Sequence, residues 1–180
     1  PTRRSSDLPM MERFETGDYP KDLFLTGSEA ADIVDNNTAL VVVDVNRPSI
    51  TEEPDLLKLV KTIVVIDHHR MAVGHIDNPT LIYHEPYASS ASELVCELLQ
   101  FMPKENNITP LEAQALLAGI MLDTRSFALH VGVRTFEAAA FLRRCGADIT
   151  RVRKMFRDDM ASYRAKARAD RKSTRLNSSH

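Results

Sequence analysis

The sequence predicts an α/β protein, a layered domain with a mainly parallel β-sheet flanked by helices. Two apolar runs rich in β-branched residues, residues 39–45 and 62–66, are typical of strands that are buried on both faces. The 17 residues between Asp44 and Thr62 include a helical stretch at residues 56–60, and they are about the minimum for a right-handed crossover. These two strands should therefore lie side by side and run parallel.

The composition is that of an ordinary soluble protein. A formal charge of -2 over 180 residues implies no polyanion, so we expect no nucleic-acid partner. No run approaches the roughly 18 apolar residues of a membrane span, so we expect no membrane contact in this segment. Cys96 and Cys145 lie in apolar helical patterns without a C-x-x-C spacing, which indicates free thiols and a cytoplasmic location. A longer parent protein could still carry a membrane anchor.

Turn and cap signals define the first half of the chain. Residues 23–25 form a short strand or loop, and Thr26 and Glu29 have the spacing of a capping box that opens a helix through Val34. Pro48 prevents extension of the strand at residues 39–45. The third strand is expected at residues 80–84.

The second half is mainly helical. Ser90 and Glu93 form another capping box before a helix that reaches residue 102, and Thr109 caps a helix over residues 110–122. Residues 126–131 are a short strand or loop, and a helix over residues 135–145 stops at Gly146. A long basic amphipathic helix is expected over residues 150–168.

Acids and imidazoles stand at the carboxyl ends of the first two strands. Asp44 lies one residue before the end of the first strand, and Asp67, His68, His69 and Arg70 directly follow the second. Ligands of open α/β sheets bind beyond these strand ends. Neighbouring side chains on an extended chain point to opposite faces, so we expect one imidazole to bind a metal and the other to face a substrate or a supporting residue.

Asp123 adds a third acid, at the end of an apolar helix. A carboxylate is electrostatically unfavourable there, and either a bound metal or a salt bridge to Arg125 would offset the conflict. Carboxylate and imidazole ligands without thiolates suit manganese, magnesium or iron. A pair of such ions would support phosphoester hydrolysis, and a mononuclear site with three or four ligands is the alternative.

Hydroxyl and guanidinium groups near this edge are candidates for substrate binding. Ser89 and Ser90 stand at a helix N-terminus that suits a phosphate, although serines there more often act as simple caps. One or two of the arginines at element ends should bind phosphate; these are Arg47, Arg70, Arg125 and Arg134. The other histidines lack paired acids, and only His130 is a further candidate for substrate contact; they are His75, His84 and His130.

Four blocks in order resemble the DHH phosphoesterase family, over about residues 23–167. They are the triplet Asp67-His68-His69, VVVDVNRPS around Asp44, EPYASSASELV at residues 85–95, and GIMLDTRSF at residues 119–127. The wording is most similar to the cyclic-di-AMP phosphodiesterases of that family, which open cyclic-di-AMP to linear pApA. The resemblance implies a small-molecule nucleotide substrate and a possible homodimer of the full protein.

The resemblance also implies roles for the site residues. Asp44 would bridge two Mn²⁺ ions, with Mg²⁺ or Fe²⁺ as possible replacements, and His68 and Asp123 would bind the second ion. His69 would face the scissile phosphate, and Asp67 would orient the histidines. The expected catalytic residues are therefore His69 and Asp67. The expected metal ligands are Asp44, His68 and Asp123.

Two blocks of the family pattern are missing. No histidine followed by Asp-x-Asp precedes Asp44, and the glycine-rich histidine block of the companion C-terminal domain is absent. Residues 1–8 and 171–180 are patternless and look like translated sequencing adapter. We therefore expect an incomplete catalytic domain over residues 9–150, truncated at both ends, and a linker helix over residues 151–170 towards the companion domain. Such a fragment should hold at most one metal, and weakly.

Other functions remain open on the sequence. Within the same family these are a nanoRNA or pAp phosphatase, a RecJ-like exonuclease and a pyrophosphatase. A domain that binds nucleotide without cutting it is a different class. The simplest alternative is an α/β domain whose acids and histidines are surface features, in which case Asp44, His68 and Asp123 would lie far apart.

Overall fold

The computed structural model describes residues 8–71, 73–103 and 108–156. They divide into two compact units, one over residues 20–147 and one that combines residues 8–19 with residues 148–156. Residues 1–7 of the tail expected at residues 1–8, the whole tail expected at residues 171–180, and residues 157–170 of the expected linker helix lie outside the described residues. No helix within the described ranges combines the length and apolar character that crossing a membrane requires.

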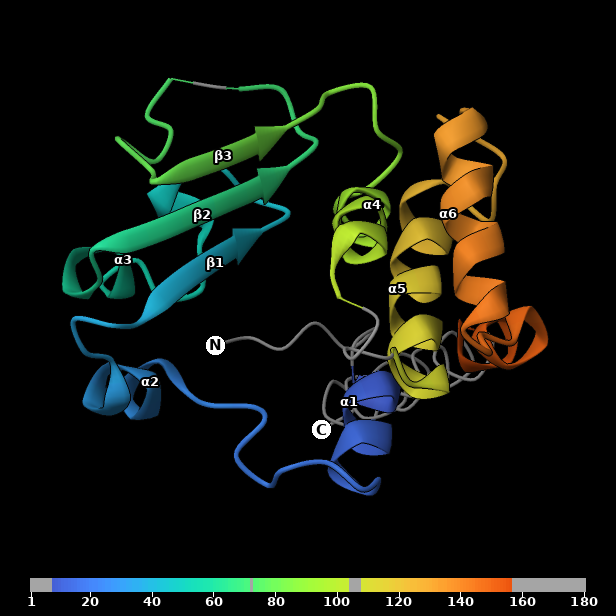
Figure 1. Ribbon diagram of the computed structural model, residues 1–180, viewed down its shortest axis with the longest axis horizontal. Coiled ribbons are helices and arrows are strands. Elements are labelled where there is room, and N and C mark those ends of the chain that lie inside the picture. Colours follow the sequence, from blue (N-terminus) through green and yellow to red (C-terminus); the bar gives the residue numbers. More distant parts are fainter. Residues whose placement is uncertain (1–7, 72, 104–107, 157–180) are drawn as a thin grey trace, which may run out of the picture. The chain divides into compact units, whose positions relative to one another are not determined.

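The centre of the larger unit is a three-stranded parallel sheet, as the sequence predicts (Figure 1). Its strands are β1 (Ala39–Val43), β2 (Thr62–Asp67) and β3 (Leu81–His84), in the order β1-β2-β3. Val43 pairs with Ile66, and Asp67 pairs with His84. The register therefore brings the carboxyl ends of all three strands to one edge of the sheet.

The two faces of β2 pack into two separate apolar clusters. Val65 packs with Val42 and Ile76 on one face, while Ile66 packs with Ala88 and Leu94 on the other. Alternation along the strand explains this division, because neighbouring side chains point to opposite faces. The prediction of a strand buried on both faces is confirmed for these two residues of β2.

The same prediction is wrong for β1. Val41 is 52% exposed and Val43 is 42% exposed, so one face of this strand is open. The physical reason is the placement of the helices: the cluster on that face contains Ile66 and Leu94 but neither of these valines. The strand also ends at Val43, two residues earlier than the sequence predicts.

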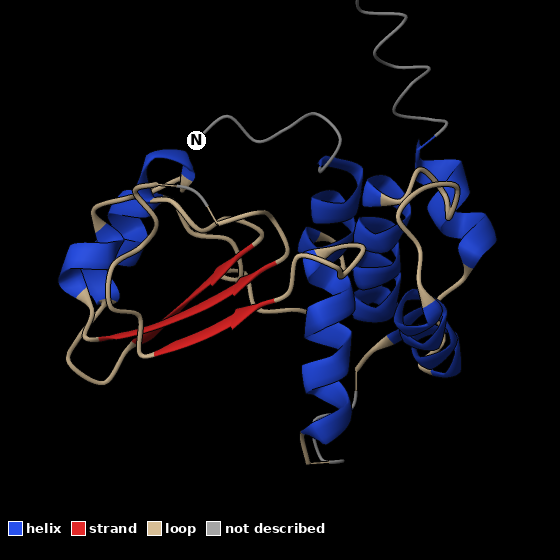
Figure 2. Ribbon diagram, turned by 90° about the horizontal axis from the view of Figure 1, so that it is seen from above, coloured by secondary structure: helices blue, strands red, loops and turns tan. Residues whose placement is uncertain are grey.

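Helices precede and follow the strands close to their predicted positions. Before the sheet and in the crossover lie α2 (Gly27–Ile33), the 3-10 turn η1 (Pro48–Ile50) and α3 (Leu56–Leu59). After the sheet follow α4 (Ala91–Phe101), α5 (Pro110–Asp123) and α6 (Val133–Arg144). Figure 2 shows these last three helices grouped on the side to which the strand ends point. Helix α4 contacts β2, and the three helices contact one another.

The predicted caps are formed, with one exception. Thr26 with Glu29 and Thr109 with Glu112 make complete capping boxes. At α4, Ser90 accepts from the Glu93 N–H as predicted, but the Glu93 carboxyl group bonds Ser89 instead of returning to Ser90. The capping box is therefore only half formed, and the Glu93 carboxylate accepts hydrogen bonds from Ser89 and Thr135 instead.

Close contacts fix the ends and crossings of the helical group. Gly146, the residue after the C-cap of α6, has a φ of +95°, which confirms the predicted stop of the helix. A Cβ on Gly119 of α5 would lie 2.2 Å from the Ser92 hydroxyl of α4, so glycine allows these helices to approach. Residues 126–131 form turns rather than a strand, since Ser126, Phe127 and His130 have positive φ.

The smaller unit contains a helix that the sequence pattern does not predict. Helix α1 (Leu8–Glu15) occupies residues that carry no clear pattern, and residues 149–156 are also helical. Arg13 Nη1 lies 3.5 Å from the Met155 sulfur, and the rings of Phe14 and Tyr19 meet edge to face. A two-turn helix is too short to be stable alone, so tertiary packing explains its formation.

Replacing Leu94 by Ala should lower the free energy of unfolding by about 2–5 kcal/mol, because the fully buried side chain joins α4 to β2. Urea unfolding followed by circular dichroism measures the change. Phe101 on the same helix is 89% exposed and provides the matched control, since its replacement by Ala should change stability by less than about 0.5 kcal/mol. Equal losses in the two variants would contradict this packing.

Cys96 should resist alkylation in the folded chain. Burial raises the pKa of its thiol to about 12, so almost no thiolate forms near neutral pH, whereas Cys145 is only half-buried. Iodoacetamide at pH 8 followed by peptide mass spectrometry should label Cys145 and spare Cys96, and both should react in guanidinium chloride. Labelling of Cys96 at the rate of Cys145 in the folded state would refute the expectation.

Candidate metal centre

Asp44 occupies the first position after β1 and is held there by the backbone. Its N–H donates to the Ile66 carbonyl at 2.9 Å, and its φ is +68°. This left-handed conformation, which aspartate tolerates better than most residues, ends the extended strand at Val43. The side chain stays half exposed at the edge of the sheet. Asp44 is thus beside the end of β2 as predicted, but just beyond the strand.

His68 and His69 lie directly after β2 and face the same region. Their ring centroids are 4.4 Å apart, and one ligand atom each from Asp44, His68 and His69 falls within 4.8 Å of the others. The expectation that the two imidazoles point to opposite faces is wrong. Strict alternation applies only within the strand, and β2 ends at Asp67.

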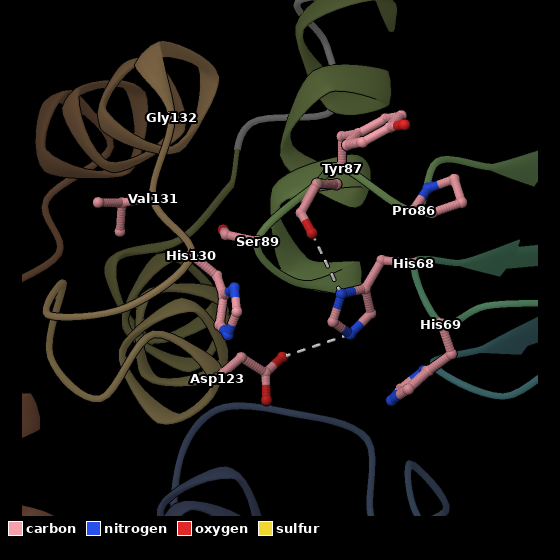
Figure 3. A pocket seen from close by; sticks show the side chains of 10 residues that line it. His68, His69, Pro86, Tyr87, Ser89, Asp123, His130, Val131 and Gly132 are labelled. Carbon is pink, nitrogen blue, oxygen red and sulfur yellow. Dashed lines mark hydrogen bonds and ion pairs between the residues drawn. The ribbon is translucent and has the colours of Figure 1, made fainter.

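Asp123 joins this cluster from a different element. It is the last residue of α5, and its Oδ2 lies 3.8 Å from His68 Nε2 (Figure 3). The Asp44 Oδ1 lies 3.4 Å from the same nitrogen. The three groups predicted as metal ligands are therefore neighbours, and the alternative in which they are scattered is excluded.

The orientation of His68 suits a ligand. Its Nδ1 lies 3.3 Å from the Ala88 carbonyl oxygen, an acceptor, so the proton belongs on Nδ1 and the Nε2 lone pair faces the carboxylates. Nε2 is buried and has no hydrogen-bond partner among the described residues. Neighbouring ligands around one divalent cation stand about 3 Å apart, so small side-chain rotations would bring these groups into coordination. The residues present therefore fit a divalent cation.

The carboxylates also influence the protonation of His68. Asp44 beside Nε2 raises the pKa of the imidazole, against the opposing effect of burial, and Asp123 adds to the rise. A protonated ring would balance part of the negative charge of the two acids. A divalent cation would balance more of it, because it carries twice the charge and binds both carboxylates.

Asp67 supports the cluster without joining it. Its carboxylate is fully buried and accepts from the Asn46 side chain at 2.5 Å and from His69 Nδ1 at 2.8 Å. It also accepts from the His69 backbone N–H at 3.2 Å. These bonds fix the His69 ring and compensate the burial of the acid. Asn46 was not among the predicted site residues, and its only signal was its position two residues after Asp44.

A cavity of about 510 Å³ opens beside the cluster, within the range of small-ligand sites. Asp123 and His130 lie next to each other, and His68 lies across from His130 (Figure 3). Its walls come from the strand end, the loop before α4 and the loop before α6. The lining residues are His68, His69, Pro86, Tyr87, Ala88, Ser89, Asp123, His130, Val131 and Gly132.

The predicted substrate-binding serines use their hydroxyls inside the protein. Ser90 is fully buried and caps α4, while Ser89 lines the cavity but donates its hydroxyl to Glu93 at 2.5 Å. The capping alternative is therefore formed at Ser90. Contact of either serine with a substrate stays a prediction.

The predicted arginines differ in their surroundings. Arg134 makes a two-pronged ion pair with Glu97 at 2.5 and 2.6 Å, lowers the pKa of that carboxyl group, and lines a separate cavity. Arg70 and Arg125 are exposed close in sequence to His69 and Asp123. Phosphate binding by Arg70, Arg125 and Arg134 stays a prediction, and Arg134 would first have to leave Glu97.

Comparison with known proteins identifies related chains. The DHH family, N-terminal domain, matches residues 7–120. A cyclic-di-AMP phosphodiesterase GdpP of Bacillus subtilis (strain 168) is 48% identical over 145 residues, which are 81% of this chain and 22% of that protein. A cyclic-di-AMP phosphodiesterase PdeA of Listeria monocytogenes serotype 1/2a (strain 10403S) is 36% identical over 170 residues, 93% of this chain and 26% of that protein. The chain thus spans about a fifth to a quarter of the length of these relatives.

A solved structure shares the fold. The exopolyphosphatase-related protein from Bacteroides fragilis superposes with a TM-score of 0.66, covering 79% of this chain and 43% of that chain. The two sequences are 22% identical, so this likeness concerns the arrangement of strands and helices.

Replacing His68 by Ala should weaken binding of Mn²⁺ by at least about tenfold, because the variant removes the buried nitrogen that faces two carboxylates. Isothermal titration calorimetry with MnCl₂ measures the affinity. His75 is exposed and outside the cluster, so its replacement by Ala is the matched control and should leave the affinity unchanged. Equal affinities of the wild-type chain and the His68 variant would disprove the site.

Proposed function

Because the chain belongs to the DHH family, which is metal-dependent, we propose that it is part of the catalytic domain of a phosphodiesterase that hydrolyses cyclic-di-AMP to pApA. The observation that carries this proposal is the His68 Nε2 atom, which is buried without a hydrogen-bond partner among the described residues and faces Asp44 and Asp123. Relatives named as cyclic-di-AMP phosphodiesterases, 36–50% identical, support the substrate. The chain spans only 22% and 26% of two of these relatives, which supports the proposal that it is an incomplete catalytic domain.

We propose a task for each site residue, which the geometry supports. A bound divalent ion lowers the pKa of a water molecule and neutralises charge that develops on the phosphate. Asp44, His68 and Asp123 would hold it, and Mn²⁺ suits this set of oxygen and nitrogen ligands, with Mg²⁺ or Fe²⁺ as substitutes. His69 borders the cavity and would face the phosphate, and Asp67 keeps that ring in place through Nδ1.

The cavity supports a small nucleotide as the substrate. Its volume of about 510 Å³ suits part of a dinucleotide, and Tyr87 and His130, which line it, carry rings that would stack on a base. Arg70 and Arg125 would attract the phosphates. We propose on this basis that the protein takes part in second-messenger signalling and acts in the cytoplasm.

Turnover of cyclic-di-AMP by the complete parent protein tests the proposal. With Mn²⁺ the protein should release pApA, measured by ion-exchange chromatography, and EDTA should stop the reaction. Replacing Asp44 by Asn or His68 by Ala should lower kcat by at least about a hundredfold, because each removes a ligand of the ion. The His75→Ala protein should retain full activity.

Parallel assays distinguish cyclic-di-AMP from the other substrates of this class. The same preparation is given pAp, short RNA dinucleotides, single-stranded DNA and pyrophosphate. A higher kcat/KM for any of these would replace the proposed substrate. Binding of cyclic-di-AMP without release of any product would assign a non-catalytic nucleotide-binding domain instead.

A further inference from the structure

Glu93 is a buried acid whose carboxylate does not take part in capping α4. Its side chain is 2% exposed, and one oxygen, Oε2, accepts three hydrogen bonds. The donors are the Ser89 N–H at 3.2 Å, the Ser89 hydroxyl at 2.5 Å and the Thr135 hydroxyl at 2.7 Å. Ser90 alone already caps the helix, so helix formation does not require this carboxyl group.

The three donors connect Glu93 to two of the segments that line the cavity. Ser89 belongs to the loop before α4, which lines the cavity through residues 86–89. Thr135 belongs to the first turn of α6, and its hydroxyl oxygen accepts from the N–H of Gly132 at 3.0 Å, a residue that also lines the cavity. One buried oxygen atom of Glu93 therefore ties both loops to α4.

The loop that contains Ser89 also contacts the candidate metal ligand His68. Ala88, the neighbour of Ser89, offers its carbonyl oxygen to His68 Nδ1 at 3.3 Å. The Ala88 N–H donates to the Glu85 carbonyl at 3.0 Å, so the peptide groups on both sides of Ala88 are held. The position of this carbonyl fixes both the rotation of the His68 ring and its tautomer.

We propose that Glu93 is a positioning residue, which sets the shape of the cavity and, through Ser89 and the Ala88 carbonyl, aims His68 Nε2 at Asp44 and Asp123. The inference rests on the proposed function in that it assigns His68 to a metal ion. Glu93 neither lines the cavity nor belongs to the candidate ligand group. A buried acid is costly unless its acceptors are satisfied, and here the three bonds that compensate it are the ones that hold the walls.

The test compares variants of the full chain by nitrogen NMR of the His68 ring, by calorimetry with MnCl₂, and by thermal unfolding. Replacing Glu93 by Ala should move the His68 Nδ1 and Nε2 signals towards a mixture of tautomers and weaken Mn²⁺ binding by about tenfold. Glu93→Gln should restore both readouts, because the amide oxygen can accept the same three bonds. A role in stability alone would lower the melting temperature without moving the His68 signals.

Glu97 provides the matched control on the same helix. It is one turn further along α4 and bonds Tyr83 and Arg134 beside a different cavity. Its replacement by Ala removes a partly exposed ion pair with Arg134 but should leave the His68 signals and the Mn²⁺ affinity unchanged. Two further variants distinguish the contributions of the two loops to the orientation of His68. Ser89→Ala should move the His68 signals, and Thr135→Val should leave them unchanged.

Wild-type His68 signals and Mn²⁺ affinity in a folded Glu93→Ala chain would overturn the proposal. If that variant does not fold, Ser89→Ala decides, and unchanged His68 signals there would overturn it as well. These readouts need no turnover, so a parent protein that fails to hydrolyse cyclic-di-AMP would remove the proposed function while the role of Glu93 remained measurable.

Discussion

The parallel pairing of β1 with β2 is the constraint on which the site depends. Val43 stands opposite Ile66, so the next residues along both strands, Asp44 and Asp67, emerge at the same level of one sheet edge. A shift of the register by one residue would send every side chain of a strand to the other face. The two apolar clusters on β2 prevent such a shift, because Val65 and Ile66 are each buried on their own side.

Two buried acids support the cluster without belonging to it. Asp67, which is buried and does not line the cavity, holds His69, and Glu93 holds the loops that form the cavity walls. Each acid is satisfied by donors from other elements, which makes its position as rigid as the core around it. The groups that face the cavity can remain partly exposed, while their orientation is set inside the protein.

The charge of the cluster explains why a cation belongs there. Asp44 and Asp123 approach the same nitrogen of His68 from β1 and from the C-terminal end of α5, where the helix dipole adds further negative potential. Folding brings the two carboxylates close together, and their mutual repulsion destabilises the folded chain. The raised pKa of His68 offsets part of that repulsion, and a divalent ion would turn the arrangement into a favourable one.

The sequence by itself determined the features that local chemistry controls. Apolar runs marked the parallel strands, and Thr26 and Thr109 marked helix starts. Asp44, His68 and Asp123, which the sequence predicts as metal ligands, lie together in the structure. Only the tertiary structure decided how the side chains share partners. It turned His68 and His69 to the same side, exposed one face of β1, paired Arg134 with Glu97 and gave Glu93 its donors. Periodicity and caps depend on residues a few positions apart, whereas a buried hydrogen bond depends on which distant segments meet.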